Sequence, residues 1–249
     1  MYLSMREQRW MADLFACLAE DHSNASVRLE VGRLLLRLVH ADYFASYIWD
    51  RAGKRFAQGV TVNMSPDNLG SYERYYQFHD PITFKLKARC VPTLVTEVMP
   101  QRELTRTEFF NDFLGRDGLH WGVNMYCVSG SRHVGDVRIW RSRRRENFDQ
   151  RELDILALVR PALTRALERA EAQRQCAHVR SGRASELVRR LSPREAQVAQ
   201  LVSEGLADKE IARSLSVSVT TVRTHIERLF GKLGVHKRSA VGLALQRHA

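Results

Sequence analysis

Residues 191–234 contain three consecutive amphipathic patterns, and each has its own start and stop signals. The first pattern begins at Ser192, where a serine N-cap, Pro193 at the first helical position and Glu195 three residues after the cap form a capping box. Gly205 follows the last apolar residue and is typical of a left-handed helix end. These spacings predict a helix of about three turns.

The second and third patterns follow after short connections. Asp208 is a candidate N-cap for the second helix. The turn at Ser216–Ser218 is so short that the third helix must cross the second at a steep angle. Ser218 can cap this third helix and Gly234 ends it, while Val241 and Leu245 indicate a fourth helix that begins near Arg238.

The third helix has one apolar and one polar face. Apolar residues recur at helical spacing, and they are Val222, Ile226, Leu229, Phe230 and Leu233. The opposite face holds the candidate DNA-binding residues Thr220, Thr221, Arg223, Thr224, His225, Glu227 and Arg228. Arginine can donate two hydrogen bonds to guanine, and threonine can contact thymine or phosphate. The arrangement is that of a helix-turn-helix, in which the last helix enters the major groove.

Further basic residues flank this face. Lys209 stands at the start of the second helix, a position that usually crosses the DNA backbone, and Lys232, Lys237 and Arg238 can reach flanking phosphates. Glu227 either accepts from a cytosine amino group or forms an ion pair with Arg223. The formal net charge of +11 and the pI of about 9.9 also favour a polyanionic partner. From the helices alone, a small bundle with solvated faces remains the alternative.

The joint pattern resembles the LuxR-type (NarL/FixJ-type) helix-turn-helix family. The matching motifs are L-S-P-R-E at Leu191–Glu195, G-x-x-x-K-E-I-A at Gly205–Ala212, L-x-V-S-x-x-T-V-R-T-H at Leu215–His225 and K-L-G-V-x-x-R at Lys232–Arg238. The resemblance implies a four-helix domain that binds double-stranded DNA as a homodimer and regulates transcription. It places Arg223 on bases, and Lys209, Thr221, His225 and Lys232 on the backbone. Glu227 departs from the family pattern, which implies different preferred bases.

Cysteine usage and apolar runs restrict the setting. Cys17, Cys90, Cys127 and Cys176 form neither a C-x-x-C pair nor a zinc pattern, so we expect no metal, no cofactor and a reduced compartment. The N-terminal segment is charged and does not resemble a signal peptide. No window reaches the roughly 18 apolar residues of a membrane span. The sequence predicts a bacterial cytoplasmic protein, associated with the nucleoid and not with a membrane.

Upstream of these helices, two strand pairs alternate with helices. Residues 1–40 have helical periodicity, 43–49 and 55–62 predict one hairpin, and Gly122–Val128 with Val134–Trp140 predicts another. Helices are expected near Asp67–Phe78, Ile82–Lys87 and Thr107–Arg116, and a long helix after Asp149 is expected to kink or divide at Pro161. The predicted fold class is an α/β domain, with an antiparallel sheet covered by helices on both faces, followed by an all-α four-helix domain.

This element order is similar to GAF/PAS-like sensor domains and to the autoinducer-binding domains of quorum-sensing regulators. The segment Tyr75–Ile82, with Asp80-Pro81, resembles the Asp-Pro segment in which the aspartate of autoinducer binders accepts a hydrogen bond from the ligand amide. The resemblance implies a small-molecule effector. However, the upstream tryptophan and tyrosine that frame an acyl-homoserine lactone are replaced by Asp67 and Ser71.

The candidate ligand-binding residues are Tyr72, Tyr76, Asp80 and Trp121. Either the aromatic residues frame a different ligand, or they are ordinary core and surface residues and Asp80-Pro81 only starts a helix. The predicted organisation is a sensor and dimerisation domain at 1–170, a linker at 171–190 in which Ser181-Gly182 breaks the helix, and a DNA-binding domain at 191–249.

Three alternatives and one motif stay open. The chain is either a ligand-modulated regulator, with RNA polymerase as a further candidate partner, or a ligand-independent regulator, or an antagonist that heterodimerises with a related regulator. An enzyme is not expected, because no Ser/His/Asp order, metal spacing or phosphate-binding glycine loop is present. The cluster Arg141, Arg143, Arg144 and Arg145 is a solvated turn, a phosphate contact or an interdomain contact.

Overall fold

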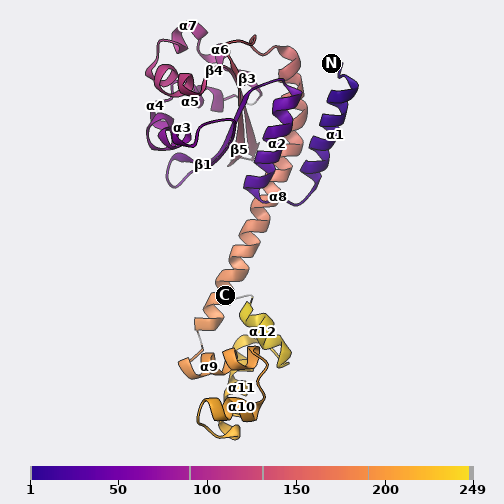
Figure 1. Ribbon diagram of the computed structural model, residues 1–249, viewed down its shortest axis with the longest axis vertical. Coiled ribbons are helices and arrows are strands. Elements are labelled where there is room, and N and C mark those ends of the chain that lie inside the picture. The colour runs from indigo at the N-terminus through magenta and orange to yellow at the C-terminus, as the bar shows by residue number, and fades with distance from the viewer. Residues whose placement is uncertain (1, 90, 131, 190, 247–249) are drawn as a thin grey trace. The chain divides into compact units, whose positions relative to one another are not determined.

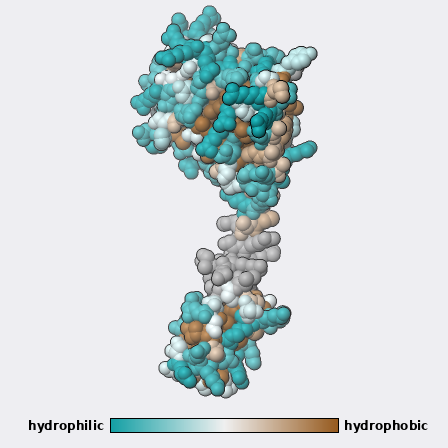
Figure 2. Space-filling model, turned by 45° about the vertical axis from the view of Figure 1, so that its right-hand side comes forward, coloured by the Kyte–Doolittle hydropathy of each residue, from teal (hydrophilic) through white to brown (hydrophobic). Residues whose placement is uncertain are grey.

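The computed structural model describes residues 2–89, 91–130, 132–189 and 191–246. The chain forms two compact units, Met1–Ala172 and Gln173–Ala249, and each has its own hydrophobic core (Figure 1). Within the described residues, no helix combines the length and apolar character that a membrane crossing requires. Hydrophilic residues cover most of the face of the first unit that Figure 2 shows.

The first unit begins with the two helices α1 (Met5–Ala19) and α2 (Asn24–Leu38). Ser4 caps α1 and forms a capping box with Glu7, while the side chain of Ser23 caps α2. Each cap satisfies backbone N–H groups that have no partner inside the helix. The predicted helical character of residues 1–40 is therefore confirmed as two helices.

A five-stranded antiparallel sheet follows, in the order β2-β1-β5-β4-β3. The strands are β1 (Tyr43–Asp50), β2 (Arg55–Val62), β3 (Thr93–Leu94), β4 (Leu119–Ser129) and β5 (Arg132–Ser142). Both expected hairpins, β1–β2 and β4–β5, are confirmed. The edge strand β3 was not predicted, because two residues give no detectable alternation.

Helices cover both faces of the sheet (Figure 1). Phe44, Val123, Met125 and Ile139 point to one face and join a core with α1, α2 and the long helix α8. Tyr47, Tyr126 and Trp140 point to the other face and join a second, aromatic-rich core. The predicted fold class of this unit is confirmed, because alternate residues along each strand are buried on opposite faces.

Short helices contribute most of the residues that pack against the sheet in the second core. They are α3 (Pro66–Ser71), the π-helix η1 (Tyr72–Tyr76), α4 (Gln77–His79), α5 (Thr83–Lys87), α6 (Val95–Val98), α7 (Gln101–Leu104), the π-helix η2 (Phe109–Phe113) and the 3-10 helix η3 (Leu114–Asp117). Gly118 ends η3 with φ of 80°, a conformation that glycine adopts without strain. Helix α6 and helix α7 were not predicted.

The long helix α8 (Gln150–Arg189) corrects one prediction, because it continues through Ser181-Gly182, where a break was expected. Pro161 lies inside the helix and does not divide it, so a division is excluded from the two expected effects of this proline. A glycine inside a helix costs only about 1 kcal/mol relative to alanine, so the good helix formers on both sides outweigh it. Residues 171–189 of the expected linker are therefore helical.

The second unit contains the four expected helices after α8. They are α9 (Pro193–Ser203), α10 (Asp208–Ser214), α11 (Val219–Leu233) and α12 (Ser239–Gln246). Ser192 caps α9 with the predicted capping box to Glu195, and the side chain of Ser218 caps α11. Gly234 ends α11 in the left-handed conformation, as predicted.

Candidate nucleic-acid interface and sensor cavity

Helix α11 has one buried face and one exposed face. Val222, Ile226, Leu229 and Leu233 are buried against α9, α10 and α12. The candidate DNA-binding residues on the other side of α11 are exposed, except for the half-buried His225, and they are Thr220, Thr221, Arg223, Thr224, Glu227 and Arg228. The predicted residues therefore share one accessible helix face, as major-groove reading requires.

Arg223 is an accessible hydrogen-bond donor on this face. Its side chain is 70% exposed, and its Nε lies 3.4 Å from Oδ2 of Asp208. The partner of Arg223 is thus the first residue of α10, and the described contacts of Glu227 include no ion pair with Arg223. One of the two readings of Glu227, an ion pair with Arg223, is not realised in this structure.

Asp208 also binds Arg238, which lies just before α12. Nη1 of Arg238 is 2.5 Å from Oδ1 of Asp208, and Nη2 donates to the carbonyl oxygen of Leu206. The expectation that Asp208 is an N-cap was wrong by one residue, because α10 begins at Asp208 and Ala207 occupies the cap position. The carboxylate is thereby directed towards two arginines instead of its own helix backbone.

The two basic residues Lys232 and Lys209 differ in their surroundings. Nζ of Lys232 lies 2.6 Å from Oε2 of Glu195, whose side chain is only 5% exposed. This bond, together with the capping-box bonds to Ser192, lowers the pKa of Glu195 to about 2. Lys209, in contrast, is exposed at the start of α10. Lys232 therefore links α11 to α9, a role that the sequence pattern did not indicate.

The second unit carries most of the net positive charge. Residues 173–249 hold 14 Lys and Arg against 6 Asp and Glu, whereas residues 1–172 hold 25 against 22. The excess favours contact with a phosphate backbone by the second unit in particular.

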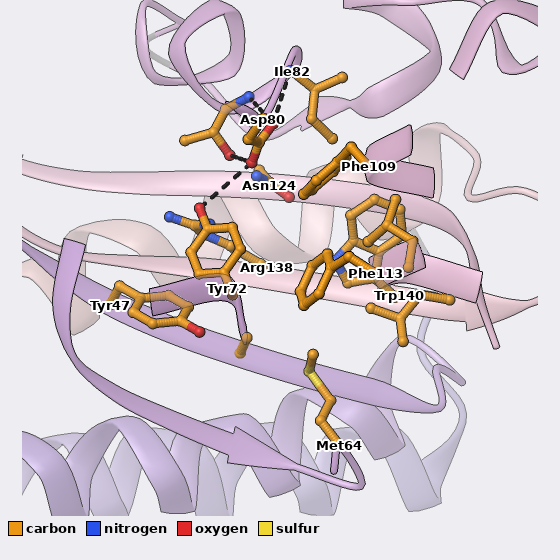
Figure 3. A pocket seen from close by; sticks show the side chains of 14 residues that line it. Tyr47, Met64, Tyr72, Asp80, Ile82, Phe109, Phe113, Asn124, Arg138 and Trp140 are labelled. Atoms are coloured by element: carbon orange, nitrogen blue, oxygen red, sulfur yellow. Dashed lines mark hydrogen bonds between the residues drawn. The ribbon is translucent and has the colours of Figure 1, made fainter. Parts of the chain in front are cut away.

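A small cavity lies on the second face of the sheet in the first unit (Figure 3). Its volume is about 20 Å³, enough for a water molecule, whereas sites for drug-sized ligands measure about 300–1,000 Å³. Aromatic side chains fill the space around it, since Tyr72 packs on Phe113 with ring centroids 5.3 Å apart and on Tyr47 at 5.2 Å. The space is therefore too small for such a ligand in this structure.

Asp80 and Tyr72, two of the four predicted ligand residues, line this cavity. Oδ1 of Asp80 accepts hydrogen bonds from the backbone N–H groups of Ile82 and Thr83 at 2.8 and 2.9 Å, and Oδ2 accepts from the Thr83 hydroxyl at 2.5 Å. The carboxylate thus fixes the start of α5. Burial raises its pKa, and these bonds oppose that effect.

The other two predicted ligand residues lie outside the cavity. Tyr76 is half-buried, does not line the cavity and stacks on Phe113, with ring centroids 5.4 Å apart. Trp121 packs against the first core, on the opposite face of the sheet, and its Nε1 donates to the carbonyl oxygen of Arg145 at 2.9 Å. The structure therefore does not bring the four residues together, because Trp121 lies on the face of the sheet opposite to the cavity.

Sequence reasoning missed the most polar part of the cavity wall. Arg138 is buried and binds Asp136 at 2.7 Å and the hydroxyl of Tyr72 at 2.5 Å. Its guanidinium also lies over the rings of Phe56 and Tyr47, 4.4 and 4.8 Å from their centroids. Oδ1 of Asn124 is buried in the same wall and has no hydrogen-bond partner among the described residues. The sequence did not predict the inward orientation of Arg138, because a charged residue in a strand is usually exposed.

Comparisons with known proteins agree with this geometry for the second unit. The family described as bacterial regulatory proteins, luxR family, matches residues 189–243. Residues 189–243 are a helix-turn-helix domain of the LuxR family. An HTH-type transcriptional regulator of Mycobacterium bovis is 50% identical over 48 residues, which is 19% of this chain and 5% of that protein. This chain thus spans only a small part of the length of the curated relatives that it matches.

Solved structures resemble the first unit. The GAF domain of a phosphoenolpyruvate-protein phosphotransferase from Coxiella burnetii has a TM-score of 0.55 and 12% identity, and the match covers 68% of this chain and 96% of that domain. A GAF domain of the corresponding Acinetobacter protein has a TM-score of 0.50 and 10% identity, over 68% and 97%. These similarities show that the first unit has a GAF-like fold.

Proposed function

We propose that this protein is a sequence-specific DNA-binding regulator of transcription that acts as a homodimer in the bacterial cytoplasm, with α11 as its recognition helix. The observation that carries the proposal is the exposed face of α11, which presents Arg223 together with several threonines. The opposite, apolar face of the same helix is buried in the core of the second unit. The LuxR-family match over residues 189–243 supports the same function. In a dimer, two recognition helices read half-sites about one DNA turn apart.

Selection of duplexes from a random pool by the full-length protein tests this function. We expect enrichment of an inverted repeat, and a gel shift of the enriched duplex that weakens steeply with salt. The accessible Lys209 and Arg223 argue against an antagonist without its own DNA site. Failure to enrich any sequence at low salt would contradict the proposal.

For the first unit, we propose that a small molecule modulates DNA binding by opening the cavity of Figure 3. The GAF-like fold and the unpartnered Oδ1 of Asn124 support this proposal. A ligand would have to separate Phe113 and Phe109 from the sheet, because the present space of about 20 Å³ admits only water.

The small cavity favours a second candidate, a regulator that works without a ligand. Native mass spectrometry of the purified protein, before and after mild denaturation, separates the two. A small mass that is released on denaturation supports the sensor. A dimer without an adduct, whose melting temperature is unchanged by a panel of lactones and small aromatic compounds, supports the ligand-independent regulator.

A further inference from the structure

The arginine cluster that follows β5 divides into residues with different tasks. Arg141 is buried and donates to the carbonyl oxygen of Val39 at 2.7 Å and to the carboxylate of Glu152 at 2.8 Å. Arg145 forms an ion pair with Asp42 at 2.9 Å. Arg143 and Arg144 are exposed, and the described part of the chain offers neither of them an ion-pair partner. Arg141 and Arg145 thus stabilise the fold through these contacts. Arg143 and Arg144 make no comparable ion pair among the described residues.

Arg143 lines a groove that a second exposed arginine, Arg102, also lines. The groove has a volume of about 540 Å³ and Arg102 of α7 lines it as well. This volume lies within the range of about 300–1,000 Å³ that small-molecule sites occupy. None of the described residues that line the groove is acidic, and Arg102 likewise has no ion-pair partner in the described structure. Two free guanidinium groups therefore face one space.

The floor of the groove is partly aromatic and contains one unsatisfied polar atom. The rings of Phe110 and His120 meet edge to face with centroids 5.6 Å apart, and Leu119 lies beside them. Nε2 of Gln101 donates to the carbonyl oxygen of His120 at 2.9 Å, whereas Oε1 is buried without a partner among the described residues. The groove thus combines a cationic rim with an apolar floor.

The charge of Arg143 reaches this floor. Burial lowers the pKa of His120, and the nearby Arg143 lowers it further. Both effects favour the uncharged imidazole. A bound anion on the rim would oppose the influence of Arg143.

We propose that this groove binds a small organic anion, a carboxylate or phosphate monoester attached to an aromatic body. The anionic group lies between the guanidinium groups of Arg102 and Arg143, and the ring rests on Phe110 and His120. Charge-assisted bonds to arginine are well suited to both anions. The site adjoins the cavity of Figure 3 at Leu119, which lines both spaces, and all its residues lie within 1–172. It adjoins the turn that leads into α8.

Saturation-transfer NMR and calorimetric titration of the full-length protein test the site with benzoate, phenyl phosphate and the neutral isostere benzamide. We expect saturable binding of at least one anion, and much weaker binding of benzamide. Arg143→Ala and Arg102→Ala should each weaken anion binding about tenfold, because each removes one charge-assisted hydrogen bond. Arg144→Ala is the matched control, because Arg144 is the next residue in the chain but lines a different groove, which includes Asp42.

Each outcome decides the proposal. A preference for benzoate or for phenyl phosphate identifies the anionic group and supports the site. Equal losses in Arg143→Ala and Arg144→Ala would show that binding follows net charge, and the proposal would be wrong. The proposal would also be wrong if neither anion bound saturably. All three arginines are exposed, so circular dichroism should show that the variants keep the fold.

Discussion

Nζ of Lys232 lies 2.6 Å from the buried carboxylate of Glu195, and this bond joins the end of the recognition helix to the start of α9. Lys232 is also a predicted contact to the DNA backbone. Its side chain is 39% exposed, so the same ammonium group is available to solvent on one side. We therefore expect Lys232 to affect DNA affinity through stability as well as through charge.

We expect Lys232→Met to destabilise the second unit by about 1–2 kcal/mol, because the carboxylate of Glu195 then stays buried without its charged partner. Thermal unfolding of the full-length protein measures the effect. Lys237→Met is the control, since Lys237 is exposed and its described contacts include no ion pair. A smaller loss in Lys232→Met than in Lys237→Met would contradict the role in stability.

The depressed pKa of Glu195 predicts a pH dependence of stability. The folded-state pKa is about 2 and the ordinary value is 4.5, so Glu195 contributes stability that is fully present above about pH 4.5. This contribution is lost as the pH falls from about 4.5 to about 2. Denaturant unfolding between pH 2 and pH 6 checks the direction. Glu195→Gln should flatten the dependence in this window, and an unchanged profile would show that other carboxylates cause it.

Base reading and backbone binding should separate in two variants. Arg223→Ala should cost roughly 1–3 kcal/mol on the selected duplex and reduce discrimination at one base position. Lys209→Ala should weaken all sequences alike and reduce the slope of affinity against salt by about one. Arg213→Ala is a control for loss of charge, because this exposed arginine of α10 is not a predicted contact. Unchanged site preference in Arg223→Ala would refute its assignment.

The features that sequence predicted well are local ones. The capping box of Ser192 and Glu195, the cap at Ser218 and the left-handed Gly234 each depend on residues within one helical turn. The two hairpins were also predicted, because alternation and turn residues are visible over a few positions. The polar face of α11 follows from helical spacing alone.

The features that sequence did not predict depend on contacts between distant segments. The bond between Glu195 and Lys232 spans 37 residues, and the pairing of Tyr72 with Arg138 spans 66. Trp121 was grouped with the ligand residues although β4 directs it to the opposite face, a distinction that needs the register of the sheet. The uninterrupted α8 is a different case, because the helix formers on both sides of Ser181-Gly182 outweigh the cost of the glycine.

Asp208 offers a last prediction, because one carboxylate contacts both Arg223 and Arg238. We expect Asp208→Asn to release both arginines. Non-specific affinity should then rise, since one negative charge is lost next to the DNA-binding face, whereas discrimination should fall about threefold to fivefold, in line with exposed ion pairs of up to about 1 kcal/mol. Affinities for the selected duplex and for a scrambled duplex at one salt concentration give both quantities. Glu204→Gln makes the same charge change at an exposed residue whose described side-chain partner is Gln200 and neither arginine, so it should raise non-specific affinity without loss of discrimination. If both variants lost discrimination equally, Asp208 would have no role in positioning Arg223.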